Sequence, residues 1–112
     1  MNQALPPAKP PGKPPLHSVT LYDGKNYTGA SLDIPHEGQK QLGPFDGKAS
    51  SLRIHVQRWV RFHTYANWEG RFLEFRGPVG IPDLEKYGRE LFGDWNDEIA
   101  SVEVMPPSYH GK

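Results

Sequence analysis

The chain has 112 residues, no cysteine, and equal numbers of basic and acidic residues, 13 of each. The balanced charge argues against a broad nucleic-acid-binding surface, and no apolar run approaches the length of a membrane-spanning helix. Because a disulfide framework is excluded, any support beyond the hydrophobic core must come from packing or from a metal ion. We therefore expect one small monomeric domain with a modest core and with no nucleic-acid or membrane partner.

The segment of residues 1–16 differs from the rest because proline recurs from Pro6 to Pro15. Proline favours polyproline II and removes backbone donors, so this segment cannot join the interior of a sheet. The stretch from Pro7 to Pro10 matches the PxxP pattern of SH3 ligands, but a semi-rigid spacer is the simpler interpretation. We expect residues 1–16 to be a flexible tail or linker. No charged-then-apolar signal sequence opens the chain, so we expect a cytoplasmic protein or a segment of a larger secreted one.

From residue 17 onward, short runs of alternating apolar residues predict β-strands. In the first half, about residues 17–57, the apolar positions are Val19, Leu21, Leu32, Ile34, Leu52, Ile54 and Val56. In the second half, about residues 58–105, they are Trp59, Val60, Phe62, Phe72, Leu73, Phe75, Val102 and Val104. Between the last two runs, the stretch from Pro82 to Gly88 predicts one helical turn, capped by Asp83. Residues 106–112 form a C-terminal tail that begins with two prolines.

Two short motifs occur twice, in the same order in each half. The first motif runs from Tyr22 to Gly29 and again from His63 to Gly70, with a ring first, Asn and an aromatic in the middle, and Gly last. That Gly suits a positive φ after a tight β-hairpin, over which the aromatics would fold. The second motif, Phe45–Ile54 and Trp95–Val104, predicts a loop rich in oxygen ligands that leads into a half-buried strand. The repetition predicts two equivalent halves.

These motifs resemble those of the βγ-crystallin family. Its Greek-key signature is aromatic, four residues, aromatic, one residue, Gly, and its calcium-binding members carry Asn/Asp-Asn/Asp-x-x-Ser/Thr-Ser in each of two motifs. The resemblance covers about residues 17–105. It implies an all-β fold, a β-sandwich of two Greek-key motifs at about 17–57 and 58–105, with one short helical turn. The residues expected in the shared core are Leu52, Ile54, Val102 and Val104.

One departure from the family pattern is His63, which stands where the family prefers Tyr or Phe. The imidazole can still cover the hairpin, but with less apolar area, and we expect Phe62 and Tyr65 to share the missing contact. The five histidines of the chain show no spacing typical of metal ligands. We therefore expect His63 to be packed or solvated rather than bound to a metal.

The resemblance also implies calcium ligands. Calcium takes six to eight oxygen atoms, and each family loop supplies a side chain from its second position, a backbone carbonyl from its third and a hydroxyl from its fifth. At these positions the first loop has Gly47, Lys48 and Ser50, and the second loop has Asp97, Glu98 and Ala100. Because family sites share ligands between the two loops, Ser50 and Asp97 would form one complete site with the carbonyl of Lys48 or Glu98. Gly47 and Ala100 would fall together in the other, degraded site.

The alternative for these loops is that they serve only as folding devices, in which Ser50 and Ser51 bond to backbone donors. No nucleophile elbow or Gly-rich phosphate loop indicates catalysis, and carboxylates such as Glu69 and Glu74 are interpreted as solvated charges. The sequence thus predicts a non-enzymatic structural module that binds calcium (Ca2+) and no other cofactor. The alternative function is a calcium-independent binding or inhibitory module on the same sandwich, for example a protease inhibitor, a toxin or an adhesive part of a larger protein.

Overall fold

The computed structural model of the chain describes residues 16–88 and 93–111. The tail predicted for residues 1–16 therefore lies almost entirely outside the described residues. The strands are β1 (Val19–Gly24), β2 (Thr28–Ile34), β3 (Ser51–Ile54), β4 (Trp59–Tyr65), β5 (Glu69–Arg76), β6 (Val79–Ile81) and β7 (Ser101–Val104). The short 3₁₀ turns are η1 (Gly43–Phe45), η2 (Ala66–Trp68) and η3 (Leu84–Lys86). None of these described turns is long and apolar enough to span a membrane.

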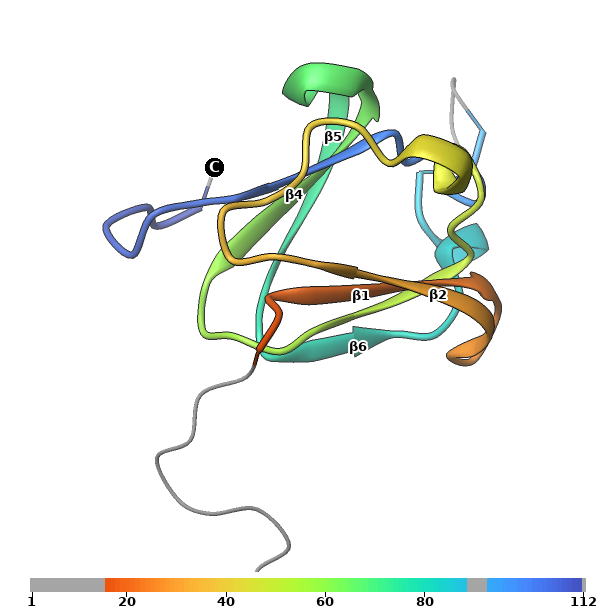
Figure 1. The fold of residues 1–112 in the computed structure, drawn as a ribbon, viewed down its shortest axis with the longest axis horizontal. Coiled ribbons are helices and arrows are strands. Elements are labelled where there is room, and N and C mark those ends of the chain that lie inside the picture. The colour runs from red at the N-terminus through yellow and green to blue at the C-terminus, as the bar shows by residue number, and fades with distance from the viewer. Residues whose placement is uncertain (1–15, 89–92, 112) are drawn as a thin grey trace, which may run out of the picture.

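Two antiparallel sheets face each other, which confirms the predicted all-β sandwich (Figure 1). The first sheet has the order β2-β1-β3-β6 and the second has the order β5-β4-β7. Strand β6 comes from the second half of the chain but pairs with β3 of the first half, through Leu52 opposite Ile81. This exchange is what closes the Greek keys into one unit.

The sequence analysis did not predict β6, because Gly77, Pro78 and Gly80 interrupt its apolar pattern. The equivalent connection from the first half to the second sheet is reduced to one bridge. There, Gln39 N–H donates to Val102 O at 2.8 Å, and Val102 N–H donates to Gln39 O at 2.9 Å. The two halves therefore have the same design but unequal strand exchange.

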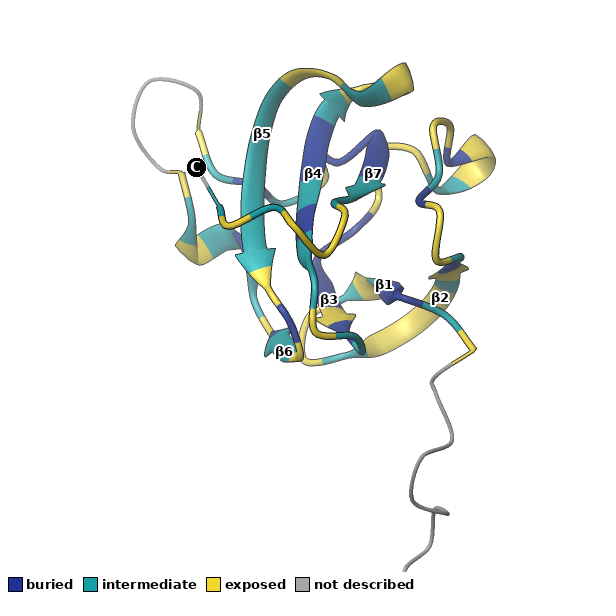
Figure 2. Ribbon diagram, turned by 90° about the vertical axis from the view of Figure 1, so that its left-hand side faces the viewer, coloured by how far each residue is buried: buried dark blue, intermediate teal, exposed yellow. Residues whose placement is uncertain are grey.

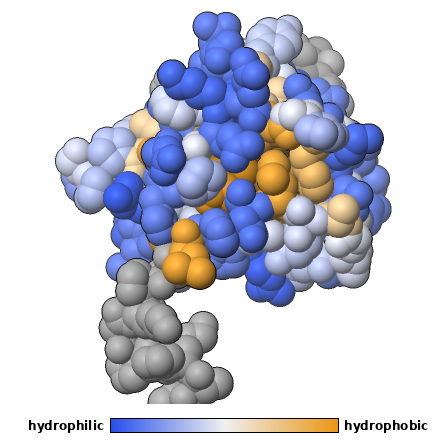
Figure 3. All heavy atoms as spheres, in the orientation of Figure 1, coloured by the Kyte–Doolittle hydropathy of each residue, from blue (hydrophilic) through white to orange (hydrophobic). Residues whose placement is uncertain are grey.

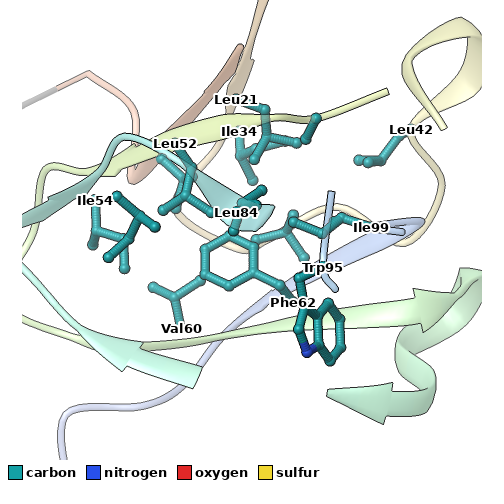
Figure 4. Close-up of a cluster of buried hydrophobic side chains, with 14 residues drawn as sticks. Leu21, Ile34, Leu42, Leu52, Ile54, Val60, Phe62, Leu84, Trp95 and Ile99 are labelled. Carbon is teal, nitrogen blue, oxygen red and sulfur yellow. The ribbon is translucent and has the colours of Figure 1, made fainter. Parts of the chain in front are cut away.

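The core fills the space between the sheets (Figure 4). Side chains from both sheets are fully buried, with Val19, Leu21, Ile34, Leu52, Val60, Phe62 and Val102 at 0% exposure. The four predicted core residues lie there, although Val104 is only half-buried against the cluster. Leu84, Trp95 and Ile99 add to the core from the connecting segments. On the face shown in Figure 3 the surface is mainly hydrophilic, and apolar residues show near its centre, where Figure 1 has the space between the sheets.

The helical turn predicted between Pro82 and Gly88 is confirmed as η3. The side chain of Asp83 accepts a hydrogen bond from Glu85 N–H at 3.0 Å, as a capping residue should. The turn is held in place because Leu84 is completely buried.

Both hairpin motifs adopt the same backbone conformation. Gly29 and Gly70 each have φ of 82°, as the positive-φ prediction requires. The first motif's rings, Tyr22 and Tyr27, meet edge to face at 5.7 Å. In the second motif His63 is buried. Of the two predicted outcomes, packed or solvated, the structure shows the packed one.

The expectation that Phe62 and Tyr65 share the missing aromatic contact is correct for Tyr65 only, because a Cβ atom added to the hairpin glycine Gly70 would lie 2.9 Å from the Tyr65 ring. His63 itself has a different aromatic neighbour. Its ring packs against Phe72 of β5, with ring centroids 5.6 Å apart. Phe62 points to the opposite face of β4, into the core, and Tyr65 is exposed. The contact instead follows strand pairing, because Phe72 lies directly opposite His63 in the register of β4 and β5.

Candidate metal centre

The first motif loop (residues 46–51) and the second motif loop (residues 96–101) are joined by a reciprocal pair of hydrogen bonds. Asp97 N–H donates to Ala49 O at 2.9 Å, and Gly47 N–H donates to Ile99 O at 3.0 Å. Each bond links the second position of one loop to the fourth position of the other. The two loops are therefore related by an approximate twofold axis, and the second position of each lies beside the fourth position of its partner.

The second position has the same left-handed backbone in both loops. Gly47 has φ of 74° and Asp97 has φ of 61°. Asp is one of the few side-chain-bearing residues that tolerate this conformation. A Cβ atom added to Gly47 would lie 3.5 Å from Asp97 O, an ordinary van der Waals contact. The first motif loop thus has the shape and the room for the carboxylate that its partner carries.

The fifth position of each loop is attached to the hairpin motif of its own half. Ser50 N–H donates to Tyr22 O at 2.8 Å, and Ala100 N–H donates to His63 O at 2.8 Å. Ser50 is buried, and its carbonyl accepts from Leu84 N–H at 3.0 Å. Within residues 16–88 and 93–111, no hydrogen bond uses the Ser50 hydroxyl. Asp97 N–H is bonded to the carbonyl of the residue directly before Ser50, so the backbones of these two residues are neighbours.

The predicted ligand at the third position of each loop is a backbone carbonyl, and the N–H of the same residue closes the loop's turn. Lys48 N–H donates to Phe45 O at 3.1 Å and Glu98 N–H donates to Trp95 O at 3.4 Å. In the part of the chain that the structure describes, neither the Lys48 nor the Glu98 carbonyl accepts a backbone hydrogen bond. Two of the predicted ligand atoms are thus without a competing protein donor there.

The sixth position has a structural role in both loops. Ser51 Oγ accepts from Tyr27 N–H at 2.9 Å and donates to Gly24 O at 2.7 Å. Ser101 Oγ accepts from Trp68 N–H at 3.1 Å and donates to Tyr65 O at 2.6 Å. Of the two serines interpreted as possible folding devices, Ser50 and Ser51, the structure shows this role for Ser51.

Asn96, at the first position of the second motif loop, was not a predicted ligand. Its N–H donates to the Asp94 carboxylate at 3.0 Å, while its own Oδ1 is buried with no partner among the described residues. The sequence signal that could have drawn attention to Asn96 is the motif itself, whose first position is Asn or Asp. This orphan acceptor adds an oxygen atom at the start of the loop.

The candidate ligand atoms at the two loops are oxygen atoms. The described residues contain no group of three or more His, Cys, Asp or Glu side chains placed to hold a metal ion. The predicted ligands are instead the Asp97 carboxylate, the Ser50 hydroxyl and backbone carbonyls, which is the oxygen chemistry that calcium takes. In the first hairpin, Lys25 Nζ lies 2.9 Å from Glu85 Oε1, and this hydrogen bond is the main cause that raises the pKa of Lys25.

The fold is similar to that of several solved structures. No protein-family model and no curated protein sequence matches the chain. Among solved structures, a βγ-crystallin from an archaeon is similar at a TM-score of 0.63 and 24% identity, covering 78% of this chain and 95% of that one. A βγ-crystallin from Ciona intestinalis is similar at a TM-score of 0.64 and 20% identity, covering 78% of this chain and 98% of that one. A βγ-crystallin domain from Flavobacterium johnsoniae is similar at a TM-score of 0.60 and 24% identity, covering 83% of this chain and 99% of that one. The chain therefore has the βγ-crystallin fold.

Proposed function

We propose that this chain is a non-enzymatic module that binds one calcium ion between its two motif loops. The observation that supports it most directly is the reciprocal pair of hydrogen bonds between the loops, which sets Asp97 beside Ser50. The ligands would be the Asp97 carboxylate, the Ser50 hydroxyl and the carbonyl of Lys48 or Glu98. A carbonyl from the neighbouring hairpin and water would complete the shell.

The twofold-related site is proposed to be inactive. Its second position is Gly47 and its fifth is Ala100, so neither side chain offers an oxygen atom. With only one carboxylate in the remaining site, the affinity should be modest, with a Kd on the order of 10⁻⁵ to 10⁻³ M. An ion held by both loops ties the two halves of the sandwich together and so stabilises the folded state. Calcium at a hundredfold excess over Kd would add about 2.7 kcal/mol to the free energy of unfolding.

The test is calorimetric titration with calcium, followed by thermal melting of the same samples. Asp97→Gly removes the carboxylate without straining the backbone, because Gly47 already takes this conformation in the partner loop. Asp97→Gly and Ser50→Ala should each abolish the heat of binding and the calcium-dependent rise in Tm. Glu98→Gln is the matched control: it removes one adjacent negative charge but leaves the proposed carbonyl ligand, so binding should persist.

Magnesium provides the control for specificity, because it demands a near-ideal octahedral shell and keeps most of its water. It should produce little heat and little change in Tm. If the unmodified protein gives no heat at millimolar calcium, the proposal is wrong and the calcium-independent binding module remains. Two equal sites in the unmodified protein would contradict the ligand sharing between loops.

A further inference from the structure

After β7 the chain turns back and crosses the second sheet on the side away from the core. In Figure 2 this C-terminal arm (residues 105–111) passes in front of β4 and β5. Its start is fixed, because Met105 N–H donates to Trp59 O at 2.9 Å and Arg58 Nη1 donates to Met105 O at 2.8 Å. Beyond that point, the only backbone hydrogen bond found within the described arm is Tyr109 N–H to Pro106 O at 3.0 Å. The arm is therefore held mainly by its side chains.

The surface under the arm is built by two strands of the sheet. Arg61 of β4 and Glu74 of β5 are directly opposite each other in the register, and Arg61 Nε donates to Glu74 Oε1 at 3.2 Å. The guanidinium also stacks over the Phe72 ring at 4.2 Å. The side chains of Arg61 and Glu74 are only 19% and 12% exposed. These contacts lie within the sheet, so the geometry of the pair does not rest on the arm alone.

Tyr109 of the arm bonds to both members of this pair. Its hydroxyl accepts from Arg61 Nη2 at 2.7 Å and donates to Glu74, with Oε1 at 2.9 Å and Oε2 at 3.2 Å. Burial works against the charge of Arg61, but the hydrogen bonds with Tyr109 and Glu74 raise its pKa above the ordinary value. The Tyr109 ring meets Trp59 edge to face, with centroids 6.3 Å apart.

A phenol is the side chain that matches this arrangement. The guanidinium offers only donors and the carboxylate offers only acceptors, so the group between them must accept from one and donate to the other. The flat ring then lies against Trp59. Phenylalanine would fill the same space, and Arg61 and Glu74 would keep their bond to each other but lose their hydrogen bonds to the hydroxyl, which lowers the affinity of the site for the ring.

We propose that Trp59, Arg61 and Glu74 form a binding site for a tyrosine side chain, which Tyr109 closes in cis and which a tyrosine from an extended segment of a partner protein would occupy when the arm lifts. The arm is suited to displacement, because Pro106, Pro107, Ser108 and His110 are exposed. A short tether gives Tyr109 an effective concentration in the millimolar range. A free peptide must therefore compete at similar concentrations unless the arm is weakened.

The experiment uses the full chain and its Tyr109→Ala variant, both with a chelator present so that calcium plays no part. The probe is a capped peptide with the sequence of the arm from Pro106 to Gly111, and the control peptide has Phe in place of the tyrosine. Binding is followed by NMR through the Arg61 Nε–H and the Trp59 indole N–H. The variant should bind the tyrosine peptide at least about tenfold more tightly than the unmodified chain does, and at least about tenfold more tightly than it binds the Phe peptide.

A second variant keeps the test decisive if Tyr109→Ala does not fold. Tyr109→Phe retains the ring packed on Trp59 but loses the hydrogen bonds to the charged pair, so the tyrosine peptide should displace the arm more easily than in the unmodified chain. Glu74→Gln in the same background should weaken that binding. Failure of a folded variant to bind the tyrosine peptide, or equal binding of both peptides, would overturn the proposal and leave the arm as a fixed part of the fold.

Discussion

A second calcium site should be created by two substitutions, Gly47→Asp and Ala100→Ser. Together they would supply the side-chain oxygens that the twofold-related site lacks, in a backbone that already matches the proposed site. Gly47 has φ of 74°, near the 61° of Asp97, and its added Cβ would meet no atom closer than 3.5 Å. The double variant should bind two calcium ions, whereas either single variant should bind one.

In the absence of calcium, the double variant should be less stable than the unmodified protein. The loss follows from the surroundings of each substituted position. A left-handed backbone costs a residue with a side chain about 1–2 kcal/mol, and Asp is at the low end. Ala100 is 5% exposed, so a new hydroxyl there costs about 1–3 kcal/mol until it has a partner. Calcium at a hundredfold excess over the Kd of the new site restores about 2.7 kcal/mol. In a domain of this size each 1 kcal/mol shifts Tm by about 4–8 °C.

The assay is differential scanning calorimetry with and without calcium, joined to a titration that counts the sites. The calcium-dependent rise in Tm should be about twice as large in the double variant as in the unmodified protein. The single variants measure the calcium-free cost of each change and serve as controls. A second site in Gly47→Asp alone would refute the sharing of ligands between loops, and a double variant that still binds a single ion would refute the assignment of the positions.

Two further predictions concern the hairpins. Ser51→Ala removes a hydroxyl that bridges two backbone groups of the first hairpin. It should lower the free energy of unfolding, measured by urea denaturation, by about 1–3 kcal/mol. The control Ser31→Ala, at an exposed position of β2, should change this free energy by less than about 0.5 kcal/mol. His63→Phe removes a buried Nδ1 that has no partner among the described residues, and the half-buried Glu103 that bonds to Nε2 can turn to solvent. We expect stability to stay constant or to rise by up to about 1 kcal/mol; a larger loss would show that the His63–Glu103 bond stabilises the fold.

Most strands were predictable from their apolar positions, and β6 was missed. Val19 and Leu21 announce β1 because a half-buried strand needs one apolar face. Strand β6 has three residues, one of them Gly80, and is too short to show a period. The burial of Trp95 likewise depends on its backbone N–H reaching the carbonyls of Leu84 and Tyr87, which only the tertiary structure brings together.

For the candidate metal centre, the residue types at each position could be predicted but not the contacts between loops. The chemistry of Ser50 and Asp97 is visible in the sequence, since hydroxyl and carboxylate oxygens suit calcium. Their proximity is not, because it rests on hydrogen bonds between segments about fifty residues apart, such as Asp97 N–H to Ala49 O. The structural role of Ser51 was left open for the same reason, as its partners lie in a different part of its half.

The placement of β6 also determines when this protein can fold during its synthesis. Residues 79–81 complete a sheet whose other three strands all lie before residue 55 in the chain. Phe62 and Val102, from the second sheet, fill the core beneath it. While the rest is still in the ribosome, the amino-terminal half therefore lacks its last strand and the core side chains of the second sheet. Folding must wait for nearly the whole chain, and its high contact order places the rate in the range of milliseconds to seconds. Until then the edge of β3 is open, and this nascent edge is where misassembly with a neighbouring chain would begin.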